Sequence, residues 1–278
     1  MNLVESSALI WLVSALAGFL GALTGLGGGV VITPVLTLLF GVDLRYAMGA
    51  SLVSVIATSS AAASAYVREG YSNIRIGMFL EIATTVGAII GAFLAPRAPA
   101  AGLAVLLGLV LLHSAYLSTR QHPETDGSRA ADPLAQRLRM GSSYPTAEGE
   151  QAYEVQRVKA GFAMMAGAGI ISGLLGIGSG AFKVIAMDRI MRIPFKVSTT
   201  TSNFMIGVTA AASAGVYLHR GYIDPVLAMP VMLGVTTGSL FGARRLAGAQ
   251  PRVLRLVFAV VVGLLALEMI YNGLTGRF

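Results

Sequence analysis

Long apolar segments, separated by short polar ones, dominate this chain and restrict what it can fold into. Most of them are close to the roughly 20 residues that an α-helix needs to cross about 30 Å of hydrocarbon. Charged residues are only 12% of the chain, against roughly 25% in ordinary globular domains, so a water-soluble surface is not available. The sequence therefore predicts an all-α, polytopic helical membrane protein. The apolar segments cover residues 8–40, 47–66, 76–95, 99–117, 160–187, 198–218, 225–243 and 253–272.

The composition also excludes several kinds of chemistry. The chain has no cysteine, so disulfide scaffolds, thiolate metal sites and cysteine nucleophiles are excluded. Its three histidines, His113, His122 and His219, are far apart in the sequence, which argues against a zinc enzyme. We therefore expect neither a metal nor a cofactor. The net charge of +7 does not indicate a nucleic acid partner, because the basic residues lie between apolar segments and form no run.

A polar stretch divides the chain into two halves. Residues 118–159 are rich in Pro, Asp, Glu, Arg, Ser and Gly, a composition typical of an aqueous loop. We expect residues 1–117 to form a first transmembrane unit and residues 160–278 a second. The lipid bilayer is then the main partner, and the sequence leaves the oligomeric state open.

The two halves are related by an internal repeat. Residues 18–92 align without a gap on residues 169–243, with 17 identities in 75 positions, seven of them glycines. A Tyr-x-x-x-Gly-Tyr pattern recurs in the same register, at 66–71 and 217–222. Composition alone would hardly produce that match, so the repeat predicts two copies of one structural unit.

Each repeat opens with a segment that is too long for one crossing and is interrupted by glycine. The runs are Gly25-Leu26-Gly27-Gly28-Gly29 and Gly176-Ile177-Gly178-Ser179-Gly180. Each glycine costs about 1 kcal/mol relative to alanine inside a helix, so the helix should break there. The two resulting half-helices either cross the membrane as one discontinuous helix or turn back as a re-entrant hairpin.

The distribution of Lys and Arg between loops favours the re-entrant alternative. If both first segments cross, the two sides carry 10 and 9 basic residues; if both turn back, the sides carry 15 and 4. Only the second distribution agrees with the usual excess of basic residues in cytoplasmic loops. It places both termini outside and the 118–159 loop in the cytoplasm, in a multi-pass protein of the cell inner (cytoplasmic) membrane.

An odd number of crossings per unit has a further consequence. Three spanning helices plus one re-entrant segment require the second repeat to insert upside down relative to the first. The two glycine breaks then enter from opposite faces and meet near the middle of the bilayer. Inverted repeats with discontinuous helices at their centre are typical of secondary transporters.

The predicted centre is suited to a small anion. Half-helices that start near Val30 and Ala181 present free N–H groups and roughly +0.5 charge each, and Lys183 lies about one turn past Gly180. Alternatively, Lys183 extends to the cytoplasmic surface, and the Ser and Thr residues only join helices. The candidate substrate-binding residues are Gly25, Gly27, Gly28, Gly29, Gly176, Gly178, Ser179, Gly180, Lys183, Ser51, Ser202, Asn203, Thr58 and Thr209.

Other polar residues of the apolar segments have weaker assignments. Glu81 is a candidate for proton coupling, because an intramembrane carboxyl is a functional candidate by default. Glu268 is near a helix end, and we expect it at the membrane interface. Tyr66, Tyr71, Tyr217 and Tyr222 are expected to be interfacial anchors.

The sequence resembles the TauE/SafE family, the sulfite-exporter type of membrane permease. The resemblance rests on the two glycine runs with Gly18, Pro34 and Gly49-x-Ser51 in the first half, and with Gly169 and Thr201-Ser202-Asn203 in the second. It departs at Ser179, where the family usually has glycine, and at Ile185, where a proline would match Pro34. The resemblance implies transport of sulfite, a sulfonate such as sulfoacetate, or a related organic anion.

The resulting hypothesis is export of such an anion by alternating access, with no catalytic residue. Two alternatives remain open. Gly-x-Ser-Gly around Ser179 also occurs at the nucleophile of intramembrane serine hydrolases, and the same architecture could form a passive anion channel.

Overall fold

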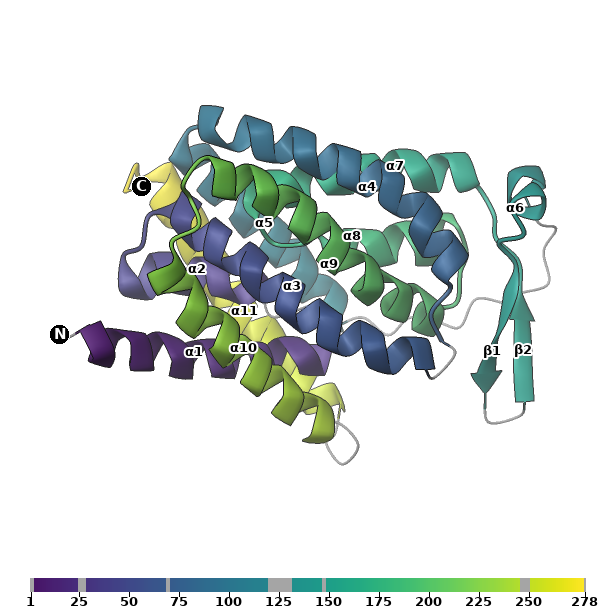
Figure 1. Ribbon diagram of the computed structural model, residues 1–278, viewed down its shortest axis with the longest axis horizontal. Helices are drawn as coiled ribbons and strands as arrows, with labels where there is room; N and C mark the ends of the chain where they lie inside the picture. Colours follow the sequence, from purple (N-terminus) through teal and green to yellow (C-terminus); the bar gives the residue numbers. More distant parts are fainter. Residues whose placement is uncertain are drawn as a thin grey trace.

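The computed structural model is a bundle of long helices with a small β-hairpin at one end (Figure 1). The structure describes residues 3–24, 29–68, 71–119, 132–146, 149–245 and 251–277. The first half contains α1 (Leu3–Thr24), α2 (Gly29–Phe40), α3 (Leu44–Arg68), α4 (Ile74–Leu94), the 3-10 turn η1 (Ala95–Arg97) and α5 (Ala100–Thr119). The middle contains α6 (Pro133–Arg137), β1 (Ser142–Thr146) and β2 (Gly149–Tyr153). The second half contains α7 (Val158–Leu175), α8 (Gly180–Ile185), the π-helical turn η2 (Ala186–Ile190), α9 (Phe195–His219), α10 (Pro225–Arg245) and α11 (Pro251–Leu274).

Several helices are suited to a membrane, which confirms a mostly helical, multi-pass chain. Four described stretches are long and apolar enough to cross a bilayer: Ile74–Arg97, Ala100–Leu117, Val158–Leu175 and Leu256–Leu274. On α4, large apolar side chains are exposed at nearly every fourth position, which places them along one face of the helix. That face is suited to lipid. Its exposed residues are Met78, Ile82, Val86, Ile90 and Phe93.

The repeat is visible in the helix boundaries. α2, α3, α4 and α5 each have a counterpart that begins 151 residues later, namely α8, α9, α10 and α11. Even the turns that end α2 and η2 correspond. The N–H of Val42 donates to Leu36 O, at 3.1 Å, and the N–H of Ile193 donates to Met187 O, at 3.0 Å.

Paired glycines show that the halves pack on each other through equivalent surfaces. Gly18 of α1 lies directly against the backbone of Val235 in α10, and its repeat partner Gly169 of α7 lies against Thr84 in α4. Val235 and Thr84 are also repeat partners, so the second contact repeats the first with the two halves exchanged. Each half therefore contributes a glycine at the same repeat position to this packing.

Equivalent helices also run in opposite directions where they meet. Gly108 of α5 lies against Ala266 of α11, whereas Gly273 of α11 lies against Ala101 of α5. Residue numbers thus rise along one helix as they fall along the other. α3 and α9 behave in the same way, because Tyr71, just after α3, accepts a hydrogen bond from Thr200 near the start of α9, at 3.0 Å.

The predicted break in the second half is present. α7 ends at Gly176, which has φ of 65° and ends the helix in the left-handed conformation, and Gly178 has φ of 75°. A side chain is disfavoured at such values, which explains the glycines. The chain then returns along α7, because Met191 O accepts a hydrogen bond from the N–H of Gln156 at 3.0 Å. Residues 158–191 therefore form a helical hairpin with both ends on the same side of the bundle.

The polar middle segment is more ordered than the sequence predicts. β1 and β2 pair antiparallel, and Tyr144, Tyr153 and Val155 pack into a core with Ile76 of α4 and Val197 of α9. The all-α prediction is corrected at this point. The strands are five residues each and carry mostly polar, exposed side chains, so they lack the apolar alternation that marks a half-buried strand.

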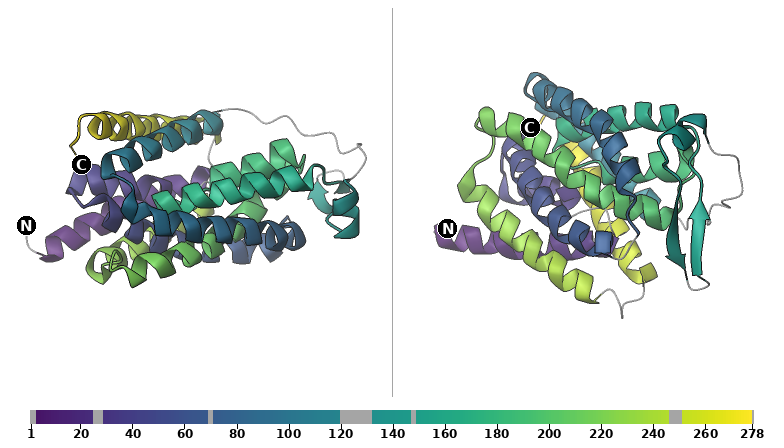
Figure 2. Two further views of the ribbon diagram at one scale, coloured as in Figure 1. Left: turned by 90° about the horizontal axis from the view of Figure 1, so that it is seen from above. Right: turned by 45° about the vertical axis from the view of Figure 1, so that its right-hand side comes forward.

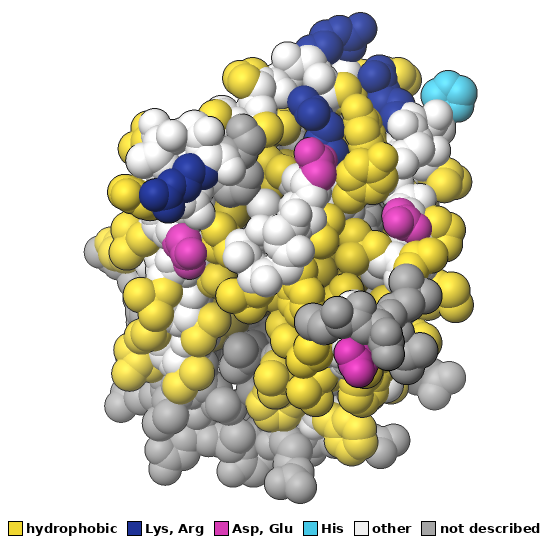
Figure 3. Space-filling view, turned by 90° about the vertical axis from the view of Figure 1, so that its left-hand side faces the viewer, with side chains coloured by type: hydrophobic (Ala, Val, Ile, Leu, Met, Phe, Trp, Pro, Cys, Tyr) yellow, Lys and Arg dark blue, Asp and Glu magenta, His cyan; other side chains and the backbone are white. Residues whose placement is uncertain are grey.

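The β-hairpin and the chain termini lie at opposite ends of the bundle (Figures 1 and 2). Figure 3 faces the terminal end and shows scattered basic and acidic side chains among apolar ones. At this end, Arg45 donates to the carbonyl of Ala98, at 3.2 Å, and Arg220 lies over the Phe93 ring. At the other end, Arg75 donates to the carbonyl of Arg139, at 3.1 Å.

Candidate functional site

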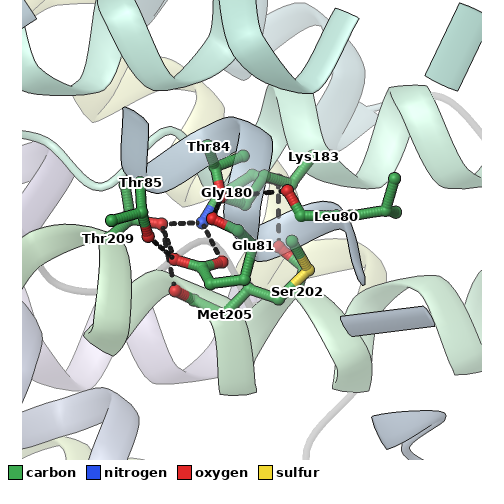
Figure 4. A network of polar contacts seen from close by, with 9 residues as sticks. All are labelled: Leu80, Glu81, Thr84, Thr85, Gly180, Lys183, Ser202, Met205 and Thr209. Atoms are coloured by element: carbon green, nitrogen blue, oxygen red, sulfur yellow. Dashed lines mark hydrogen bonds and ion pairs between the residues drawn. The ribbon is translucent and has the colours of Figure 1, made fainter. Parts of the chain in front are cut away.

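The candidate site is a buried polar network of Glu81, Lys183 and Thr209, contributed by α4, α8 and α9 (Figure 4). Lys183 has no exposed surface and Glu81 is 6% exposed. The Nζ of Lys183 lies 3.5 Å from Glu81 Oε2 and donates a short hydrogen bond to Thr209 Oγ1. Thr209 Oγ1 in turn donates to Glu81 Oε1, at 2.5 Å. The Lys183–Glu81 contact is therefore a buried ion pair.

Three elements from both halves position these groups. Lys183 is in the first turn of α8, where its N–H bonds to Ser179 O at 3.2 Å. Glu81 lies two turns along α4. Asn73 caps the start of this helix, because its side chain accepts a hydrogen bond from the N–H of Ile76 at 3.1 Å. A charged pair at this depth is costly to desolvate, so only close hydrogen-bonded partners make it tolerable. Thr209 supplies such a partner to both charges.

The starts of α2 and α8 are held by equivalent serines. Ser51 Oγ donates to Gly29 O at 2.9 Å, and Ser202 Oγ donates to Gly180 O at 3.2 Å. Ser51 and Ser202 are repeat partners, as are Gly29 and Gly180. The two serines therefore tie the half-helices α2 and α8 to α3 and α9. This contact between helices is the role predicted from the sequence as the alternative to substrate binding.

Ser179 occupies a strained position at the tip of the second break. Its φ is 49°, and the left-handed region costs a non-glycine residue roughly 1–2 kcal/mol. The residue is 3% exposed, and its Oγ has no hydrogen-bond partner among the described residues. A buried hydroxyl without a partner is uncommon in native proteins, so Ser179 has a free group to offer a ligand.

The remaining predicted positions are less directly informative. Gly25, Gly27 and Gly28 lie outside the described residues. Thr58, the repeat partner of Thr209, bonds to carbonyls of its own helix at Ser54 and Val55. Asn203 is buried on α9.

The alternative for Lys183, extension to the surface, is wrong because its side chain is fully buried. The sequence did not predict that its charge is shared with Glu81. Nothing in the sequence pattern links the two residues, which are 102 positions apart.

Tyr217 is a second residue whose role differs from the sequence prediction. It is 2% exposed rather than interfacial. Its hydroxyl donates to the carbonyls of Gly173 and Leu174, at 3.2 and 3.3 Å, near the end of α7. These carbonyls belong to the last turn of a helix and lack intrahelical partners. Tyr217 thus supports the break from the side of α9.

A multi-pass helical bundle with a glycine-broken segment and a buried ion pair defines a membrane transport protein more readily than an enzyme. The family model described as "Sulfite exporter TauE/SafE" matches residues 10–269. The chain therefore belongs to the TauE/SafE family of membrane transporters. Membership in a transporter family removes the serine hydrolase alternative for Ser179.

Curated relatives agree over nearly the full chain. The chain is 25% identical to "Probable membrane transporter protein YunE" of Bacillus subtilis, over 97% of this chain and 99% of that protein. It is 29% identical to "Probable membrane transporter protein YdhB" of the same organism, over 85% of this chain and 89% of that protein. A protein of Methanocaldococcus jannaschii, "Probable membrane transporter protein MJ0441", is 24% identical over 94% of both chains. No solved structure matches.

Proposed function

We propose that the protein exports a small anion across the cell inner membrane by alternating access, with the substrate site at the two glycine breaks. The observation that carries this proposal is Lys183, which is fully buried in the first turn after the second break. An ammonium at the centre of a membrane helix costs at least about 2.5 kcal/mol, so its presence needs a reason. The family description, a sulfite exporter, favours sulfite, sulfoacetate or another sulfonate as the anion.

The proposed architecture is a pair of inverted transmembrane repeats, residues 1–117 and 160–278. The opposite directions of α5 and α11, which are repeat partners, support an inversion. So does the helical hairpin at 158–191, because it leaves α9, α10 and α11 as the three spanning helices of the second half. The excess of basic residues then places the 118–159 loop in the cytoplasm.

The proposed substrate contacts come from the second break and from α9. Lys183 supplies the positive charge, and Ser179 Oγ and Thr209 Oγ1 supply hydroxyl groups. Backbone N–H groups at the starts of the half-helices add further donors. The glycine runs, Gly25 to Gly29 and Gly176 to Gly180, remain part of the proposed site because they break the helices there. Among the described ones, Gly29, Gly176 and Gly178 lie against neighbouring helices and allow the close packing of the breaks.

The direction of transport follows from the membrane potential. An inside-negative potential contributes about 2.3 kcal/mol per charge per 100 mV, and it drives a net negative charge outward. Export of an anion therefore proceeds without an ion gradient, whereas uptake would require one.

Flux of radiolabelled sulfite and sulfoacetate from proteoliposomes tests the proposal. We expect saturable efflux that accelerates when a valinomycin-induced potential makes the lumen negative. Lys183→Met should abolish the flux, and Lys159→Met is a matched control, because Lys159 is an exposed lysine of α7. Flux that is unchanged by the potential, or by loss of Lys183, contradicts the proposal. Flux that does not saturate would indicate a passive channel instead.

A further inference from the structure

The buried ion pair is not required by the packing of the fold. The repeat partners of Lys183 and Glu81 are Ile32 and Met232, and Ile32 is itself fully buried. The other half of the molecule thus fills the equivalent positions with apolar side chains. Apolar residues of similar size are often as stabilising as a buried ion pair, so the charges in this half serve something other than stability.

The contacts of Glu81 resemble those that an anionic substrate would make. One carboxylate oxygen faces Lys183 Nζ at 3.5 Å, and the other accepts from Thr209 Oγ1 at 2.5 Å. These are the same ammonium and hydroxyl that the proposed function assigns to the substrate. A carboxylate and a small oxyanion cannot both occupy them.

Thr209 and Glu81 each have another hydrogen-bond partner once Glu81 and Lys183 separate. Thr209 Oγ1 can instead donate its hydrogen bond to Met205 O, which lies 3.1 Å away. Glu81 keeps Thr85 Oγ1, which lies one turn along the same helix at 3.1 Å. Separation therefore leaves both hydroxyls satisfied. Once an anion pairs with Lys183, only the charge of Glu81 is uncompensated.

Among the described residues around the site, no other buried cation is available to that charge. On the elements packed against α4 and α8, the charged residues Arg97, Lys159, Arg189 and Lys196 are exposed at helix ends. Asp188 of η2 is a second buried carboxyl and supplies no positive charge. A carboxylate without a counter-charge is costly to keep in an apolar surrounding.

We propose that Glu81 occupies the substrate's place in the empty transporter, and that an anion binds by displacing it while Glu81 takes up one proton. This inference rests on the proposed function. In the exchange, the ion pair between the Glu81 carboxylate and the Lys183 ammonium is replaced by one between the ammonium and the anion. One O–H bond forms on Glu81, with a proton from hydronium or a buffer acid in the solution on the side to which the site is open.

The exchange accounts for the charge balance of a transport cycle. The empty site holds one positive and one negative charge and returns across the membrane as a neutral unit. A loaded site that contains a dianion, protonated Glu81 and Lys183 carries one net negative charge. The membrane potential therefore acts on the loaded form alone, and a dianion still moves outward with the potential.

Calorimetric titration with sulfoacetate, in buffers of different ionisation enthalpy, counts the protons taken up on binding. Sulfoacetate is fully ionised at neutral pH, so any uptake belongs to the protein. We expect the purified wild type to take up one proton per anion and therefore to bind about tenfold more weakly for each unit rise in pH above neutrality. Glu81→Gln should bind without proton uptake and without this pH dependence. Glu268→Gln, a change to an exposed carboxyl of α11, is the matched control and should behave as the wild type does.

A double variant separates this role from a structural one. Glu81→Met/Lys183→Ile copies the residues of the other half, and we expect it to fold with unchanged thermal stability but not to bind sulfoacetate. Binding by the wild type without proton uptake, or proton uptake that persists in Glu81→Gln, would overturn the inference and leave the proposed function intact. Failure of the wild type to bind or transport sulfoacetate, sulfite and sulfate would overturn both.

Discussion

Close packing between the two halves predicts opposite effects of alanine at two glycines of one helix. Gly167 and Gly169 are both in α7, two residues apart. A Cβ at Gly167 would meet nothing within 4 Å, whereas a Cβ at Gly169 would lie 2.9 Å from Thr84 Cα in α4, and closer still to the carbonyl of Thr84. Carbon atoms pack at about 3.5–4.0 Å, so Gly169→Ala must push α7 away from α4 by roughly 1 Å.

The size of the effect follows from the contacts that the displacement weakens. A gap of about 1 Å removes roughly a quarter to a half of each pair's attraction of about 0.1–0.2 kcal/mol. Over roughly 20–40 atom pairs along the interface, the loss is about 1–3 kcal/mol, the usual range for overpacking. Gly167→Ala instead gains helix propensity, worth up to about 1 kcal/mol.

Unfolding by heat, or by SDS in mixed micelles, measures the free energy of unfolding of purified Gly167→Ala and Gly169→Ala. We expect Gly169→Ala to unfold more easily than the wild type, and Gly167→Ala to equal or exceed it. Gly18→Ala, at the repeat-equivalent contact with Val235, should resemble Gly169→Ala. Equal stability of Gly167→Ala and Gly169→Ala would refute the close approach of α4 and α7.

Three further substitutions test other parts of the structure. Asn73→Ala should lower the free energy of unfolding by about 2–3 kcal/mol, because it removes a helix cap and the hydrogen bonds to Met140 O and Tyr153 Oη. Asn73→Asp keeps the cap and should lose about half as much stability. Thermal melts of both variants measure the difference. Tyr217→Phe should cost about 1 kcal/mol in the same assay, since it leaves two carbonyls of α7 without their donor, and no loss would show that water replaces it. Ser179→Ala should reduce the sulfite flux, because it removes one proposed hydroxyl contact to the substrate, while Ser179→Val, a β-branched residue in the left-handed region, should lose the flux; equal flux from the two would contradict the strained turn.

Much of the helical framework can be predicted from the sequence, because it depends on local and periodic signals. The break at Gly176 and the start of α8 at Gly180 follow from glycine's cost in helices and its tolerance of positive φ. The starts of α3 and α9 follow from the repeat, since a duplicated segment folds in the same way in both copies.

The network around Lys183 could not be predicted, because its partners are brought together only by tertiary packing. Glu81 has no equivalent in the other half, and no spacing rule connects α4 with α8. The β-hairpin was missed for a different reason. Its strands gain their stability from a few residues such as Tyr153, packed against the membrane helices, and not from an alternating pattern.

The orientation of the two repeats relative to the membrane is the most direct test of the account. The chain contains no cysteine, so single cysteines can be introduced at Asp43, after α2, and at Lys196, in the first turn of α9; both side chains sit at exposed positions. A membrane-impermeant maleimide applied to intact spheroplasts should label Asp43→Cys directly and Lys196→Cys only after permeabilisation. Labelling of both cysteines from the same side would contradict an inverted pair of repeats and the central anion site built on it.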